Sequence, residues 1–406
     1  MTAHDVRLTS LSFALPYEGV DHAGGELLLQ HHRVLVDHCA QVDVFAPEFE
    51  HNLPREGRVF TLGGNYHPSI VRYPWWRKTL VGKVLARLWI RAMPVSPDLG
   101  ACVGFVTSGQ LRDSVRSADI VELQWAEYMF FARFVRRLNP SAKIIGFVHD
   151  VPSQRIQRSV ANWPAPLRRA YLGYVAMLER RLFRDVDAVV VLSRKDADLL
   201  AGQGDSLEIC VLDPPLDVDL ADTPKAAPTP ANTAASFGFI AAFHRPENND
   251  AALWLLEHIW PHVLKSVPEA HLYLIGSRPS DELRQASARV GTSVTVTGYV
   301  EDINSFNDRF STAIIPLRYG AGVKFKTISA ILAGKNIVAT PTAVEGTLPD
   351  NYFYCVSDTS EVLAKAMVSI AENPSDGTSV ATAAMAEVGS RYSLQRYADS
   401  VMRIYS

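Results

Sequence analysis

The stretch of residues 314–346 constrains the fold of this chain more than any other. An apolar strand is expected at 313–316 and a second one at 337–340, with a short helix between them that Gly334 closes. Strand, helix and strand in this order form the repeating unit of α/β sheets. The loop before the helix is rich in glycine and in cations: Arg318, Gly320, Gly322, Lys324 and Lys326.

A glycine-rich, cationic loop placed directly before a helix has the properties of an anion site. Glycine lets the backbone come close to a ligand, and the N–H groups and dipole of the helix favour negative charge. Arginine and lysine side chains then neutralise that charge. Because a unit that only had to fold would not require so many cations at this place, we predict that the loop binds phosphate.

The alternation of strands and helices occurs twice, on either side of residues 213–236. This stretch holds five prolines and little hydrophobic periodicity, as linkers do. We therefore predict an α/β fold with two doubly wound, Rossmann-like domains that face each other across a cleft. The expected segments are an N-terminal domain over 1–215, a linker over 216–236, a C-terminal domain over 237–388, and a final helix over 389–406 that packs back toward the N-terminal domain.

Two short motifs in the first half follow predicted strands, where ligands bind in sheets of this kind. Gly24 and Gly25 come after the opening strand and start a helix, although a tight turn without a ligand explains them equally well. His149 and Asp150 follow the strand expected at 143–148. An adjacent histidine and aspartate at a strand end are candidates to receive the proton of an acceptor hydroxyl or to orient that hydroxyl.

Positive charge is concentrated in the first half. Residues 51–184 hold 21 Lys and Arg against 8 Asp and Glu, although the whole chain has a net charge of −3. This excess favours an anionic partner, either a membrane surface or a phosphate-bearing acceptor. Residues 72–93 carry six basic residues, no acidic one and three tryptophans, which suits a helix in the interface of an anionic membrane. The alternative is a helix that packs on the core and exposes a basic face to solvent.

The second half resembles a known family. The motifs FIAAFHRPENND, VTVTGYVED and IPLRYGAGVKFKTISAILAGKNIVAT, followed by VEG, are similar in order and spacing to the nucleotide-binding domain of GT-B glycosyltransferases of the family 4 type. The resemblance is specific over residues 237–346. It is weaker over the first half, where HAGG, VHD and DPPLDVD are the points of contact.

The resemblance implies a site for a nucleoside-diphosphate sugar donor in the C-terminal domain. By position, the donor residues are Gly298, Tyr299 and Val300 at the base, Arg318, Lys324 and Arg245 at the diphosphate, the backbone around Gly322 and Val323, and Gly24 and Gly25 from the other domain. His149 and Asp150 fall on the acceptor side, close to the transferred sugar. Lys326 belongs to the same cationic loop.

The chain departs from the family at two glutamates. Ser329 stands where the family usually has a glutamate that reaches the ribose hydroxyls, and Ala321 stands at the companion position. A serine can still hydrogen-bond a hydroxyl, but it is neutral and shorter. Glu345 either supplies a carboxylate near the donor or is a loop residue at the start of a helix.

The implied activity is glycosyl transfer in polysaccharide biosynthesis, with retention, to a hydroxyl of a glycan, a lipid-linked acceptor or a small molecule. No metal ion and no cofactor are expected, because fixed cations can stabilise the leaving diphosphate. None of the Asp-x-Asp strings, which begin at Asp185, Asp196 and Asp217, has the setting of a metal–diphosphate site, and the cysteines form no CxxC motif.

Two other functions stay open, and one is excluded. A sugar-nucleotide epimerase or hydrolase would need several carboxylates in the cleft, while a non-catalytic nucleotide-sugar-binding protein would be compatible with Ser329. A dinucleotide oxidoreductase requires a G-x-G-x-x-G motif after the first strand, which the chain lacks. No nucleic-acid partner is expected. The N-terminus has no charged-then-apolar leader, so we expect a cytoplasmic protein. If residues 72–93 bind the membrane, the protein would be peripheral on its inner face.

Overall fold

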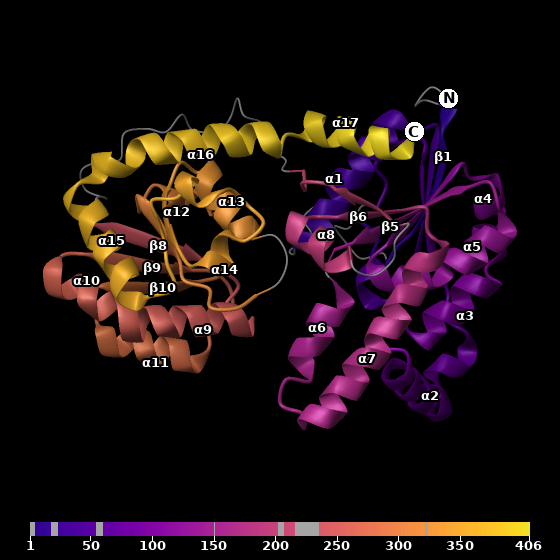
Figure 1. The fold of residues 1–406 in the computed structure, drawn as a ribbon, viewed down its shortest axis with the longest axis horizontal. Helices are drawn as coiled ribbons and strands as arrows, with labels where there is room; N and C mark the ends of the chain where they lie inside the picture. Colours follow the sequence, from indigo (N-terminus) through magenta and orange to yellow (C-terminus); the bar gives the residue numbers. More distant parts are fainter. Residues whose placement is uncertain are drawn as a thin grey trace. The chain divides into compact units, whose positions relative to one another are not determined.

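The computed structural model describes residues 5–17, 23–53, 60–149, 151–201, 207–215, 235–301, 303–320 and 324–406. The chain divides into two compact units, Met1–Asp217 with Tyr392–Ser406 and Val218–Arg391 (Figure 1). Of the linker predicted over 216–236, all but the last two residues lie outside the described part of the chain.

The first unit is built on a parallel sheet. Its described residues form seven strands in the order β3-β2-β1-β4-β5-β6-β7, and each neighbouring pair is parallel. The order reverses between β1 and β4, which makes the carboxyl ends of these two strands a topological switch point. The strands are β1 (Arg7–Leu11), β2 (Gln41–Pro47), β3 (Tyr66–Val71), β4 (Ile120–Gln124), β5 (Lys143–Val148), β6 (Ala188–Val191) and β7 (Glu208–Val211).

Helices connect these strands. The α-helices are α1 (Ala23–His38), α2 (Leu80–Ala92), α3 (Leu99–Thr107), α4 (Gly109–Ser117), α5 (Ala132–Leu138), α6 (Pro152–Ser159), α7 (Ala165–Leu182), α8 (Arg194–Leu200) and α17 (Leu394–Tyr405). Short 3-10 helices are η2 (Glu50–Asn52), η3 (Trp75–Lys78), η4 (Ala126–Phe131) and η5 (Phe183–Asp185). The central strands bury both faces, as a parallel sheet covered by helices requires. Thus Ile144 lies in one hydrophobic core and its neighbour Ile145 lies in the other.

The C-terminal helix α17 belongs to the first unit, where it lies beside α1 (Figure 1). Tyr397, Val401 and Tyr405 recur at one-turn spacing and are buried in the same core as Ile145. The Lys143 Nζ atom donates to the Ile404 carbonyl oxygen at 2.7 Å. The last residues of the chain therefore complete a core that its first residues begin.

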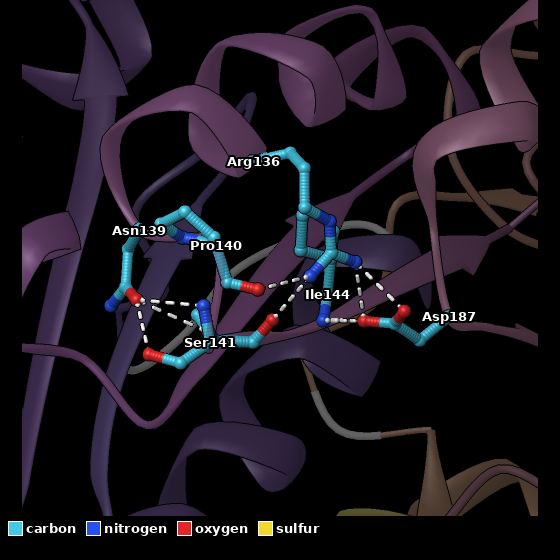
Figure 2. Close-up of polar contacts among 7 residues, drawn as sticks. Arg136, Asn139, Pro140, Ser141, Ile144 and Asp187 are labelled. Atoms are coloured by element: carbon cyan, nitrogen blue, oxygen red, sulfur yellow. Dashed lines mark hydrogen bonds and ion pairs between the residues drawn. The ribbon is translucent and has the colours of Figure 1, made fainter.

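An ion pair fixes the amino-terminal edge of β5 and β6 (Figure 2). Arg136 Nη2 donates to both carboxylate oxygens of Asp187 at 2.7 Å, and its Nη1 donates to the carbonyls of Pro140 and Ala142. The same carboxylate accepts from the Ile144 N–H at 2.7 Å. Because ligands bind at the carboxyl edge of such sheets, this cluster has a structural role.

The second unit repeats the architecture. Its described residues form six strands in the order β10-β9-β8-β11-β12-β13, again with parallel pairs. The order reverses between β8 and β11, which sets a second switch point. The strands are β8 (Ser236–Ile240), β9 (His271–Ile275), β10 (Val294–Gly298), β11 (Thr312–Ile315), β12 (Asn336–Ala339) and β13 (Cys355–Val356). The prediction of two parallel α/β sheets is confirmed.

Helices connect the strands of the second unit and continue after its last strand. They are α9 (Pro246–Trp254), the π-helix η7 (Leu255–Ile259), α10 (Trp260–Ser266), α11 (Asp281–Val290), α12 (Asn304–Asn307), α13 (Phe325–Leu332), α14 (Pro341–Val344), η8 (Asp350–Tyr352), α15 (Ser360–Glu372), η9 (Pro374–Gly377) and α16 (Thr378–Arg391). Gly334 follows α13 with a φ of 68°, a conformation that glycine adopts at helix ends without strain.

Candidate active site

Two helices begin next to each other at the switch point of the second sheet. The strands β8 and β11 are neighbours, and the chain leaves them to enter α9 and α13. Arg245 is the N-cap of α9, and Lys324 is the N-cap of α13. Both helices therefore present N–H groups and the positive end of their dipoles at the same edge of the sheet, which is the general setting of an anion site.

Three cations gather at these helix starts. Lys324 is buried, with 5% of its surface exposed, and Lys326 lies in the first turn of α13. Burial lowers the pKa of Lys326 to about 8; Glu247 opposes this shift, while the charges of Lys324 and Arg245 add to it. Burial is thus the main cause of the lowered pKa, and a bound anion beside Lys326 would favour its charged form.

The contacts of Lys326 hold its ammonium group in place. It donates to the Asn248 side-chain oxygen on α9 and lies 5.7 Å from the centre of the Phe239 ring on β8. Residues from three elements, β8, α9 and α13, therefore surround one cationic cluster, which we define as Arg245, Lys324 and Lys326.

Gly320, in the loop that follows β11, allows close packing. It has a φ of 154°, and a Cβ atom there would lie 3.4 Å from Lys324 Cε and 3.7 Å from its Nζ. A side chain at this position would strain the backbone, while its Cβ atom would touch Lys324 only at an ordinary van der Waals distance. Gly322 and Val323, predicted to present N–H groups to the diphosphate, lie outside the described residues.

Arg318, predicted to neutralise the diphosphate, binds a carboxylate in the structure. Its Nε donates to Asp250 Oδ2 at 2.9 Å and its Nη2 donates to Asp250 Oδ1. The guanidinium also lies 5.7 Å from the centre of the Trp254 ring, and the hydrogen bond to Asp250 raises the pKa of Arg318. Because Asp250 balances this charge, Arg318 has little net charge to offer an anion.

The predicted base-binding residues lie at the carboxyl end of β10, at the same edge. Gly298 has a φ of 74° and its carbonyl accepts from the Gly276 N–H at 3.1 Å. Tyr299 is 77% exposed, and Val300 is half-buried beside it. Gly276 was not predicted from the sequence. A Cβ atom at Gly276 would lie 1.9 Å from the Ala241 carbonyl oxygen, so only glycine fits where β9 ends beside β8.

The remaining predicted donor residues take different positions. Ser329 lies on an exposed part of α13, and Glu345 is the half-buried C-cap of α14, after the carboxyl end of β12. In the first unit, Gly24 and Gly25 form the first turn of α1, with Gly25 buried. The structure thus places each of these residues at a helix, and their roles stay predictions.

His149 lies directly after β5, at the carboxyl edge of the first sheet. Its Nε2 is 3.0 Å from Gln124 Oε1, and its ring stacks on Trp125 at 4.5 Å between centroids with an angle of 20°. Burial lowers the pKa of His149 to about 3, so the imidazole is neutral near neutral pH. Its Nδ1 atom is buried and has no hydrogen-bond partner among the described residues. Asp150 lies outside them.

A buried chain of hydrogen bonds fixes the tautomer of His149. Gln124 Nε2 donates to Glu122 Oε2 at 3.2 Å, so its Oε1 is the end that accepts from His149 Nε2. The hydrogen of the neutral ring is thus on Nε2, which leaves a lone pair on Nδ1. Glu122 Oε1 is in turn 2.9 Å from His31 Nε2, and His31 Nδ1 is 2.8 Å from the Tyr397 hydroxyl on α17.

Sequence reasoning missed Asp250 and Asn248, which contact Arg318 and Lys326. It also missed Gln124 and the other residues of the hydrogen-bond chain that leads from His149 to Tyr397. Asn248 and Asp250 belong to the ENND string after Arg245, so their position near the start of a helix was the available signal. Gln124 and Glu122 alternate on β4, and two polar residues in an otherwise apolar strand could have been noted.

Neither a metal site nor a membrane-spanning helix is present in the described ranges. These residues contain no group of three or more His, Cys, Asp or Glu side chains that could hold a metal ion. None of the helices that they form is long and apolar enough to cross a membrane.

Comparison with known sequences identifies both halves. A family model described as glycosyl transferases group 1 matches residues 234–373, and one described as a glycosyl transferase 4-like domain matches residues 32–214. A 44.6 kDa protein of the cps region of Klebsiella pneumoniae is 26% identical over 172 residues, which cover 41% of this chain. The match spans 44% of that relative, less than half of its length.

Solved structures share the whole fold. HepE from Anabaena in complex with UDP has a TM-score of 0.66 at 13% identity, covering 98% of this chain and 99% of that one. Sucrose-phosphate synthase from Thermosynechococcus elongatus has a TM-score of 0.68 at 15% identity, covering 98% of each chain. The expectation of a GT-B fold is thereby confirmed.

Proposed function

The chain belongs to the group 1 glycosyltransferases, and we propose that it transfers a sugar from a nucleoside-diphosphate sugar to a hydroxyl of a glycan, a lipid-linked acceptor or a small molecule. The observation that carries this proposal is the cationic cluster of Arg245, Lys324 and Lys326 at two helix N-termini. Since HepE has been crystallised with UDP and with UDP-glucose, uridine diphosphate sugars are the first donors to test.

The cationic cluster would bind the diphosphate and stabilise it as a leaving group. During transfer the bond between the anomeric carbon and the diphosphate oxygen breaks, and its electron pair stays with the nucleoside diphosphate. Negative charge on that oxygen rises, so cations and N–H groups already fixed in place stabilise the transition state more than the ground state. This electrostatic contribution supports transfer without a divalent metal ion.

The first unit would position the acceptor. The lone pair of His149 Nδ1 can accept a hydrogen bond from the acceptor hydroxyl, which orients the oxygen that forms the new bond to the anomeric carbon. With a pKa of about 3, His149 is too weak a base to hold the proton near neutral pH. Asp150, its neighbour in the sequence, is our candidate to receive that proton. The resemblance to family 4 enzymes supports retention at the anomeric carbon.

A donor screen tests the proposal. Uridine, guanosine and adenosine diphosphate sugars should be added singly to the protein, and at least one should raise its melting temperature. That shift should be lost in Lys324→Ala and kept in Lys265→Ala, a matched control because Lys265 is an exposed lysine on α10 of the same unit. Turnover of the stabilising donor with an acceptor, unchanged by a chelator, completes the test. If no donor shifts the melting temperature, the proposal fails.

A further inference from the structure

Helix α2 exposes apolar side chains that helices of globular proteins normally bury. Its buried residues are only Gly82 and Ala86. The exposed apolar residues on it are Leu80 at 79%, Val81 at 68%, Val84 at 47%, Leu85 at 44%, Leu88 at 55% and Ile90 at 54%. A monomeric protein rarely leaves so many contiguous apolar side chains in water, and such a surface marks a site of interaction.

The inner face of α2 fixes which side chains point outward. A Cβ atom at Gly82 would lie 2.1 Å from the Trp76 carbonyl oxygen, so the helix lies directly against η3. The Trp89 indole donates to the Pro97 carbonyl at 2.9 Å and packs on the hydrophobic core. Since Gly82, Ala86 and Trp89 recur at helical spacing, they form the docked side, and Leu80, Val84 and Leu88 lie on the opposite side.

Cations accompany these apolar residues on the outer side. Lys83, Arg87 and Arg91 lie on successive turns and are exposed. No carboxylate in the described parts of the chain forms an ion pair with any of the three. By contrast, Arg77 at the base of the helix binds Asp98 at 2.9 Å. The outer face of α2 therefore combines uncompensated positive charge with apolar surface.

The same character continues onto neighbouring elements. Trp75 on η3 is 80% exposed, and a hollow of about 650 Å³ opens beside it. Its lining includes Arg72 and also Lys78, which pairs with Glu48 at 3.6 Å. The Tyr174 hydroxyl of α7 donates to the Ala92 carbonyl, so α7 meets the end of α2. Figure 1 shows α2 and the start of α7 at the same end of the first unit.

The start of α7 adds a second exposed group to this end of the unit. Trp163 is 40% exposed and its ring lies 5.2 Å from the Tyr171 ring, while Leu167 is 56% exposed. Arg168 and Arg169 follow directly in the sequence. We call the outer face of α2, Trp75 and residues 163–169 the basic apolar face.

We propose that the basic apolar face docks the protein on an anionic lipid bilayer. Leu80, Val84 and Leu88 would enter the boundary between headgroups and acyl chains, and Lys83, Arg87 and Arg91 would contact lipid phosphates. Indole rings such as Trp75 favour that boundary because they are apolar with one polar N–H. A second copy of the chain fits less well, because a two-fold interface would bring these cations against their own equivalents.

Vesicle sedimentation with the full chain tests the proposal. The protein should sediment with vesicles of phosphatidylcholine and phosphatidylglycerol but not with phosphatidylcholine alone, and added salt should weaken the binding. Arg87→Glu/Arg91→Glu should lower the affinity at least tenfold. Arg284→Glu/Arg289→Glu on α11 changes the net charge equally at exposed positions of the other unit, so this control should bind as the unchanged protein does.

Two further readouts distinguish lipid docking from general charge attraction and from dimerisation. Leu88→Ser should weaken vesicle binding without changing charge, and the fluorescence of Trp75 should shift to the blue on binding, a shift that Trp75→Phe removes in part. Equal losses in both double variants would overturn the proposal in favour of general charge attraction. A dimer in light scattering that Arg87→Glu/Arg91→Glu dissociates would overturn it in favour of a second copy. Because donor-induced stabilisation is measured without lipid, its failure and the failure of lipid binding are distinguishable.

Discussion

Replacing His31 with leucine would leave the Glu122 carboxylate in the core of the first unit without its hydrogen-bond partner on α1. His31 and Glu122 are 2% and 0% exposed, and their 2.9 Å contact lies between α1 and β4. Removing the partner of a buried charged group typically costs about 3–5 kcal/mol, because the charge that stays behind is uncompensated. A carboxylate stranded in this way can instead take up a proton, which costs about 3.7 kcal/mol at pH 7. We therefore expect His31→Leu to lose about 3–4 kcal/mol of unfolding free energy.

A double variant separates this electrostatic cost from the lost packing. Glu122→Gln removes the charge and keeps the shape, so His31→Leu/Glu122→Gln should recover at least half of the loss. Unfolding in urea can be followed by tryptophan fluorescence, since five of the seven tryptophans lie in the first unit. A loss below about 1 kcal/mol in His31→Leu, within the range of exposed ion pairs, would refute the reasoning. The reasoning would also be refuted if His31→Leu/Glu122→Gln were no more stable than His31→Leu.

Three further outcomes are expected. Affinity for UDP should fall as the pH rises through about 8, because Lys326 then loses its proton, and Lys326→Met should flatten this dependence in calorimetry. Gln124→Met should lower turnover but leave the donor Kd unchanged, because His149 then loses the hydrogen bond that keeps its ring hydrogen on Nε2. A changed donor Kd with unchanged turnover would contradict this. The unfolded chain protonates this imidazole below about pH 6.5 while the folded chain, with its pKa of about 3, does not. The free energy of unfolding should therefore fall by up to about 1.4 kcal/mol per pH unit as the pH is lowered from about 6.5 toward about 3. In His149→Asn the fall should be less steep, and urea unfolding measures both.

The sequence predicted the repeating part of the structure because that part depends on local signals. Apolar strands, helix starts and the glycine after α13 are each set by residues within one turn or one strand. The position of Lys324 and Lys326 at a helix start was predictable for the same reason, since they precede or begin α13. His149 was found because it directly follows a strand that the sequence pattern predicts well.

The partners of these residues could not be predicted in the same way. Arg318 pairs with Asp250 across 68 positions of sequence, and Tyr397 meets His31 across 366. Such contacts depend on which strands become neighbours and how helices rotate, and neither is set by local pattern. The outward orientation of the apolar side of α2 is a similar case, since periodicity gives the faces of a helix but not which one meets the core.

The return of α17 to the first unit has a consequence for synthesis. Protein domains generally begin to fold from the N-terminus while the ribosome is still adding residues. Here the chain must make the whole second unit before Tyr397 and Tyr405 exist, so the core around His31 stays open until these residues have been added. The first unit is thus the first to emerge and the last to be complete. A chain that stops at residue 391 would contain both sheets and still expose that core to water.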